Sequence, residues 1–167
     1  GASRGWRGPG PVSRSAPRGV GIVGQVMMTL ELEDGLAASI LADCAARAPA
    51  EACGLLAGHD RGGTIVVRAV YPYPNESDTP RLNFSIGRAA LRDAMARAHD
   101  AGITLIGGWH SHPHGAAVPS RRDLAATIDD DWVMVVAASG RDGWRLRAWR
   151  RHDAGPDEMP VHIPAAR

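Results

Sequence analysis

Lysine is absent from this sequence: all nineteen basic residues among its 167 positions are arginine. A genome rich in G and C would produce this composition, together with the abundant alanine and glycine. Cysteine is scarce, since Cys44 and Cys53 are the only two, which excludes a secreted scaffold held by disulfides. We expect both thiols to be reduced and buried, in a cytoplasmic protein. No run of 18 apolar residues is present either, which excludes a membrane-spanning helix.

Acidic residues are missing from the start of the chain. Residues 1–26 contain four arginines and no acid, a charge of +4, whereas the rest combines fifteen arginines with eighteen acids, a charge of −3. The excess positive charge therefore gives no support to nucleic-acid binding by the folded part. Because residues 1–26 are rich in Gly, Pro and Ser without an apolar period, we expect a disordered basic extension there. Residues 27–152 have the length of one domain, and 153–167 are expected to form a C-terminal tail.

Strand and helix patterns alternate along the chain, which predicts a single α/β (α+β) domain with a mixed sheet. Two main helices are expected at 34–47 and 88–101, and a short one at 120–128. In the second helix, Leu91, Met95 and Ala98 should face the core. The segments 53–56 and 64–71 should form one hairpin, and 132–138 and 144–149 another. Further strands are expected at 28–32, 82–86 and 103–109.

The most informative stretch follows directly on the apolar strand that ends near Trp109. His110 and His112 lie two residues apart, so in a strand their side chains leave the backbone on the same side, as two ligands of one metal ion must. Neutral imidazoles suit zinc. Ser111 between them should point the other way and make a structural hydrogen bond. An H-x-H pair alone is not specific for a metal site.

The pair Ser120 and Asp123 admits two readings. A serine followed three residues later by an acid is a helix-capping pattern, and Pro119 stands just before it. The start of a helix also fixes the direction of the Asp123 carboxylate, and a third protein ligand is what an open catalytic zinc site needs. Two histidines and one carboxylate would leave the fourth tetrahedral position for water. The residues by themselves leave both readings open.

Taken together, these residues resemble the JAMM/MPN-plus (Mov34/MPN/PAD-1) metalloprotease family, whose motif is a Glu upstream, then H-[ST]-H, seven residues and S-x-x-D. Residues 110–112 read H-S-H, 113–119 supply the seven-residue spacer, and 120–123 read S-R-R-D. Upstream, residues 51–56 read E-A-C-G-L-L, similar to the E-x-C-G-L-L segment of the family. The resemblance covers residues 28–150, most of the patterned chain, and implies a cytidine-deaminase-like architecture.

The resemblance also implies a role for each polar residue. His110, His112 and Asp123 would bind one zinc ion per chain, with water as the fourth ligand. Glu51 would be the general base that takes a proton from this water and passes it to the leaving amine. Ser120 would donate a hydrogen bond to the oxyanion of the tetrahedral intermediate. Nothing in the residues alone selects Glu51 among the acids of the chain.

The short chain is similar to the minimal prokaryotic members of the family. The resemblance implies an isopeptidase or deubiquitinase-like peptidase that cleaves the amide after the C-terminal Gly of a ubiquitin-like or sulfur-carrier protein, releasing cysteine or a lysine-linked target. The partner would present a Gly-Gly tail to a monomer or homodimer, with no nucleic acid or membrane involved. Absence of lysine would then protect the enzyme from conjugation. The alternative is a non-catalytic MPN scaffold. The H-x-E with P-C-x-x-C motif of nucleobase deaminases and the H-E-x-x-H motif are both absent.

Overall fold

One mixed eight-stranded sheet organises the molecule, in the strand order β7-β6-β5-β4-β2-β3-β1-β8. The structure is a computed structural model and describes residues 27–129, 131–152 and 155–165, so the predicted extension 1–26 lies outside the described residues. The α/β (α+β) class with a mixed sheet is confirmed. The elements are β1 (Thr29–Leu32), α1 (Asp34–Arg47), β2 (Cys53–Asp60), β3 (Thr64–Tyr73), α2 (Arg88–Asp100), β4 (Thr104–His112), α3 (Arg121–Ala125), β5 (Val133–Gly140), β6 (Gly143–His152), β7 (Gly155–Met159) and β8 (Val161–His162).

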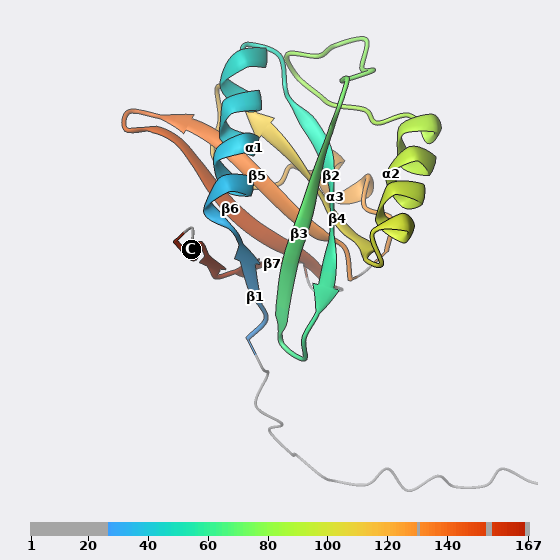
Figure 1. Cartoon of the computed structure of the whole chain (residues 1–167). Helices are drawn as coiled ribbons and strands as arrows, with labels where there is room; N and C mark the ends of the chain where they lie inside the picture. Colours follow the sequence, from blue (N-terminus) through green and yellow to red (C-terminus); the bar gives the residue numbers. More distant parts are fainter. Residues whose placement is uncertain (1–26, 130, 153–154, 166–167) are drawn as a thin grey trace, which may run out of the picture.

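The two main helices cover opposite faces of the sheet, as Figure 1 shows with α1 in blue and α2 in yellow-green. Helix α1 buries Ile40 and Cys44 against one face, in a core that includes Leu56 of β2. Helix α2 packs on the other face, where Leu55 of β2 contributes to a second core. Because successive residues of a strand point to opposite faces, neighbouring leucines of β2 serve different cores. Both faces of the central strands are thereby excluded from water.

Central strands β2 and β4 bring two distant parts of the chain to the same end of the sheet. They pair antiparallel, with Cys53 opposite His110 and Gly54 opposite Trp109. The beginning of β2 therefore lies beside the end of β4. The Ser111 amide extends this pairing with a hydrogen bond of 3.0 Å to the carbonyl of Ala52.

Helix α2 presents a different face to the core than the sequence predicts. Ala98 is buried as expected, but its partner is Ala94, whereas the Met95 side chain is 57% exposed and Leu91 is half-buried. The small alanines let α2 lie close to β2 and β3. A hydrophobicity pattern favours the larger Met95, and the prediction for this residue was wrong for that reason.

Residues 82–86, predicted as a strand, form an irregular loop between β3 and α2. Here side chains rather than a neighbouring strand satisfy backbone groups: Asn75 Oδ1 accepts a hydrogen bond from the Ser85 amide, and its Nδ2 donates to the Asn83 carbonyl. These competing bonds replace the ladder that a strand would need.

The segment 153–167, predicted as a tail, contains two strands. β7 pairs antiparallel with β6, with Ala148 opposite Met159, and Met159 is buried in the core under α1. β8 pairs parallel with β1 and forms the other edge of the sheet. The sheet thus continues ten residues past the predicted domain end at residue 152, because backbone pairing admits sequences such as Gly155–Met159 that lack an apolar alternation. No helix in the described ranges is both long and apolar enough to cross a membrane.

Candidate metal centre

His110 and His112 lie at the end of β4, and their side chains point to the same side of the sheet. His110 is 1% exposed, and its ring stacks on Phe84 with centroids 4.5 Å apart. His112 lies nearer the surface and is half-buried. Ser111 points the other way and its Oγ accepts a hydrogen bond of 2.7 Å from the Ala52 amide, which confirms its predicted structural role. That bond fixes the backbone between the two imidazoles.

Ser120 and Asp123 form a helix cap and also aim a carboxylate at the histidines. Ser120 is the N-cap of α3: its Oγ accepts from the Asp123 amide at 3.1 Å, and the Asp123 carboxylate accepts from the Ser120 amide at 2.7 Å. The same carboxylate oxygen, Oδ2, lies 3.1 Å from His110 Nε2 and 3.3 Å from His112 Nε2. The two readings of this pair are therefore compatible, because the cap holds the carboxylate in the direction that a ligand needs.

The spacing of these three atoms fits a small tetrahedral cation. His110 Nε2 and His112 Nε2 lie 3.1 Å apart, which completes a triangle with the two distances to Asp123 Oδ2. Ligand atoms at 2.0–2.1 Å from a tetrahedral zinc ion are separated from one another by roughly 3.3–3.4 Å. The geometry and the donor set of two imidazoles and one carboxylate both match zinc, and the three residues are the group in the described chain that could hold a metal.

The surroundings of His112 prepare its Nε2 for a metal. Its Nδ1 lies 2.8 Å from the Ala116 carbonyl, so a neutral ring carries its proton on Nδ1 and leaves a lone pair on Nε2. The hydrogen bond to Asp123 raises the pKa of His112, and burial lowers the pKa of His110. Burial opposes ionisation of Asp123, but its hydrogen bonds to both histidines hold the pKa of this carboxyl well below its ordinary value. The cluster thus keeps one negative charge facing two imidazoles.

Glu51 lies two residues before β2 and is only 7% exposed. Burial raises the pKa of its carboxyl to about 7; the nearby His112 lowers it and the nearby Asp123 raises it. Its Oε2 is buried and has no hydrogen-bond partner among the described residues. A buried, unpaired carboxylate beside a ligand cluster needs an external partner, and a cation or a water molecule would supply one. A pKa near neutrality is the property that a general base requires.

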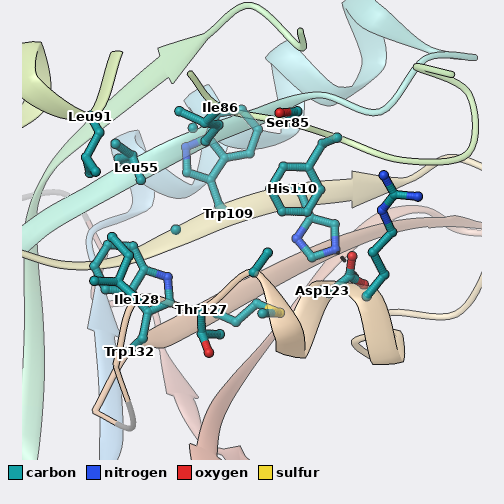
Figure 2. Close-up of a pocket in the computed structure, with 16 residues that line it drawn as sticks. Leu55, Ser85, Ile86, Leu91, Trp109, His110, Asp123, Thr127, Ile128 and Trp132 are labelled. Atoms are coloured by element: carbon teal, nitrogen blue, oxygen red, sulfur yellow. Dashed lines mark ion pairs between the residues drawn. The ribbon is translucent and has the colours of Figure 1, made fainter. Parts of the chain in front are cut away.

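A mostly apolar cavity of about 430 Å³ extends from the ligand cluster along the sheet. Figure 2 shows His110 and Asp123 at one end, joined by their ion pair, and Trp132 and Ile128 toward the other. The loop residues Phe84, Ser85 and Ile86 form one wall, and α3 with the following residues forms another. Such a cavity can hold an extended chain whose reacting end lies at the metal ligands.

Three contributors to the site were missed by sequence reasoning: Phe84, Trp132 and Asn75. Phe84 was predicted in a strand and Trp132 in a hairpin, and both line the cavity. Asn75 sits in a loop of Pro, Asn and Ser with no distinctive pattern. In the sequence Asn75 is one polar residue among several, and nothing distinguishes it from its neighbours. His114 is exposed and does not belong to the ligand cluster.

Glycine at position 54 is required by close packing, and we expect Gly54→Ala to destabilise the protein by about 1–3 kcal/mol. A Cβ at Gly54 would overlap the Trp109 indole and the Tyr71 carbonyl. Gly108 of β4, which pairs with Leu55, is the matched control: a Cβ there meets nothing closer than 3.3 Å, at the Gly54 carbonyl. Urea unfolding of both alanine variants measures the difference. Equal losses of unfolding free energy would contradict the packing argument.

Comparison with protein families matches residues 33–152 to the prokaryotic homologs of the JAB domain. Among curated proteins, a probable TtuB-protein conjugate cleaving protease of Thermus thermophilus is 31% identical over 118 residues, which cover 71% of this chain and 74% of that protein. The desampylase of Haloferax volcanii is 29% identical over 90 residues, covering 54% of this chain and 63% of the desampylase.

Solved structures give the same picture of the fold. A protein of Desulfitobacterium hafniense superposes with a TM-score of 0.75 at 25% identity, covering 83% of this chain and 94% of that one. The JAB1/MPN domain protein of Archaeoglobus fulgidus superposes with a TM-score of 0.50 at 19% identity, covering 81% and 98%. The second likeness concerns the fold alone. With the family match spanning most of the described residues, this chain belongs to the prokaryotic JAB-domain family.

Proposed function

We propose that the protein is a zinc-dependent metallopeptidase of the JAMM type that hydrolyses an amide bond after the C-terminal glycine of a ubiquitin-like or sulfur-carrier protein. The observation that carries this proposal is the triangle of His110 Nε2, His112 Nε2 and Asp123 Oδ2, with sides of 3.1–3.3 Å. A second support is the buried carboxylate of Glu51 beside it. The names of the two curated relatives, a conjugate-cleaving protease and a desampylase, favour a protein conjugate as substrate.

In this mechanism the residues of the chain divide the work. His110, His112 and Asp123 would hold a zinc ion, which would supply Lewis acidity to the site. Glu51 takes a proton from the attacking water and returns it to the leaving amine, for which a pKa of about 7 is suited. Ser120 Oγ accepts from the Asp123 amide, so its own proton is available for the oxyanion.

The cavity next to the ligands would hold the C-terminal tail of the carrier. Its wall contains Gly108, which carries no side chain, and apolar residues such as Leu55 and Leu91. An extended tail that ends in Gly-Gly suits the part of the cavity beside the metal ligands, because glycine needs no room beside the backbone. The amine released would be cysteine or a lysine side chain. We place the enzyme, as a monomer or homodimer, in the cytoplasm, in keeping with two buried cysteines that form no disulfide.

A direct assay tests the proposal. Zinc-loaded protein is incubated with two conjugates of a small carrier that ends in Gly-Gly, one linked to cysteine and one to a lysine side chain, with and without a chelator. We expect release of the free carrier, abolished by chelation and restored by added zinc. Inertness toward both conjugates in protein that holds one zinc per chain would refute the substrate. Protein that binds no zinc even after reconstitution would favour the non-catalytic scaffold.

A further inference from the structure

One side chain of the loop between β3 and α2, that of Asn75, makes a hydrogen bond to the backbone of Glu51, just before β2. Asn75 Nδ2 donates to the Glu51 carbonyl at 3.0 Å and to the Asn83 carbonyl at 2.9 Å. Its Oδ1 accepts from the amides of Ser77 at 3.0 Å and Ser85 at 3.1 Å. Nδ2 also lies 3.5 Å from the Pro80 carbonyl. The amide group thereby satisfies five backbone groups in three separate stretches of chain.

This loop reaches both functional parts of the site. Phe84 stacks on the ring of His110 and lines the cavity. Ser85 and Ile86 belong to the same wall (Figure 2). The Glu51 amide donates to the Pro80 carbonyl at 2.7 Å, so Glu51 is held through both its N–H and its carbonyl by the same loop. The backbone of Glu51 precedes β2 and has no strand partner of its own.

From these contacts we infer that Asn75 is a positioning residue, which holds Glu51 in register with the metal ligands and fixes the Phe84–Ile86 wall relative to it. The inference rests on the proposed function, in which Glu51 is the general base. Without the Asn75 bond, the Glu51 backbone keeps only the Pro80 contact to the loop, and its carboxylate is free to shift. A displacement of 1 Å from productive geometry costs about 10²-fold in rate. Zinc binding depends on other atoms, and most of the residues that line the cavity lie outside this loop.

The test uses two variants of Asn75 and one matched control. Asn75→Ala removes all five bonds, and Asn75→Asp keeps the size and the acceptor oxygen but cannot donate to Glu51. Asn83→Ala removes an amide of the same loop whose side chain bonds only to Thr79 Oγ1, at 2.9 Å. Each zinc-loaded variant is assayed on the carrier conjugate that the wild type cleaves, and each is assayed for bound zinc.

We expect both Asn75 variants to bind one zinc and to lose about 10- to 100-fold in kcat with KM changed less than threefold. Asn83→Ala should stay within twofold of wild type. In metal-free protein, hydrogen exchange at residues 49–52 and 75–87 should accelerate in the Asn75 variants while β5 and α1 stay protected, which Asn83→Ala should not reproduce. This second readout does not depend on catalysis.

Several results would overturn the inference. A rise in KM with kcat intact would mean that Asn75 serves the cavity wall alone. Equal losses in Asn83→Ala would mean that any damage to the loop suffices. If Glu51→Gln kept wild-type activity, the role of Glu51 itself would fail. If Glu51→Gln were inactive while both Asn75 variants kept full kcat and unchanged exchange, only the positioning role would fail.

Discussion

Asp123→Ala is expected to lower the affinity for zinc by at least about 100-fold and to abolish peptidase activity. Loss of residues that merely support a ligand already costs about 10–100-fold in metal affinity, and in the proposed site Asp123 would supply a ligand atom itself. Its Oδ2 lies 3.1 Å from His110 Nε2 and 3.3 Å from His112 Nε2, so its removal leaves two imidazoles to hold the ion. Zinc per chain, measured by mass spectrometry after dialysis against a chelator, gives the result.

The control for this variant is Ser120→Ala, which damages the same helix cap and leaves all three ligands in place. It removes the acceptor of the Asp123 amide and should cost about 1 kcal/mol of stability. We expect it to retain one zinc per chain and to lose about 10²–10³-fold in kcat as an oxyanion donor. If both variants lost zinc to the same extent, Asp123 would act through the cap rather than as a ligand.

The sequence predicts those parts of the site that lie close together along the chain, and it does not predict how distant parts come together. His110 and His112 share one strand, and the period of two sets their common side. Asp123 and Ser120 share the first turn of a helix, so their geometry is local too. Glu51 is brought to this cluster by the pairing of β2 with β4, and no local pattern contains that pairing. Its assignment came from family resemblance, and the structure places it beside the ligands.

The fold was predictable where one strong signal controlled each element. The hairpin of β5 and β6 was predicted from its apolar runs and its Gly-containing turn, and is confirmed. The prediction failed where side chains replaced the ladder, as at Phe84, and where small residues rather than large ones face the sheet, as at Ala94. The strand β7 was missed because its pairing partner, not its own pattern, makes it a strand. These three cases share a cause, since in each the deciding contacts come from tertiary structure.

Glu51→Gln is expected to lower kcat by about 10²–10⁴-fold while leaving one zinc per chain, because Gln keeps the shape of the side chain but cannot accept the proton. The same change should stabilise the metal-free protein near pH 8. Burial raises the pKa of Glu51 to about 7 from an ordinary value of 4.5. Between these values the folded state binds more protons than the unfolded state, so the stability due to this group is present below pH 4.5 and is lost as the pH rises through 7.

The comparison of pH values separates this effect from a general change in packing. In metal-free protein, Glu51→Gln should raise the free energy of unfolding by on the order of 1–3 kcal/mol over wild type at pH 8. The increase should be small near pH 4.5, where the folded wild-type protein already has a neutral carboxyl at this position. Glu31→Gln, on β1 beyond β3, removes the same charge away from the cluster and serves as the matched control. Urea unfolding at several pH values gives the measurement. A gain in unfolding free energy that does not depend on pH would show that Glu51 carries no buried charge. The cost in stability expected for a buried general base would then not come from Glu51.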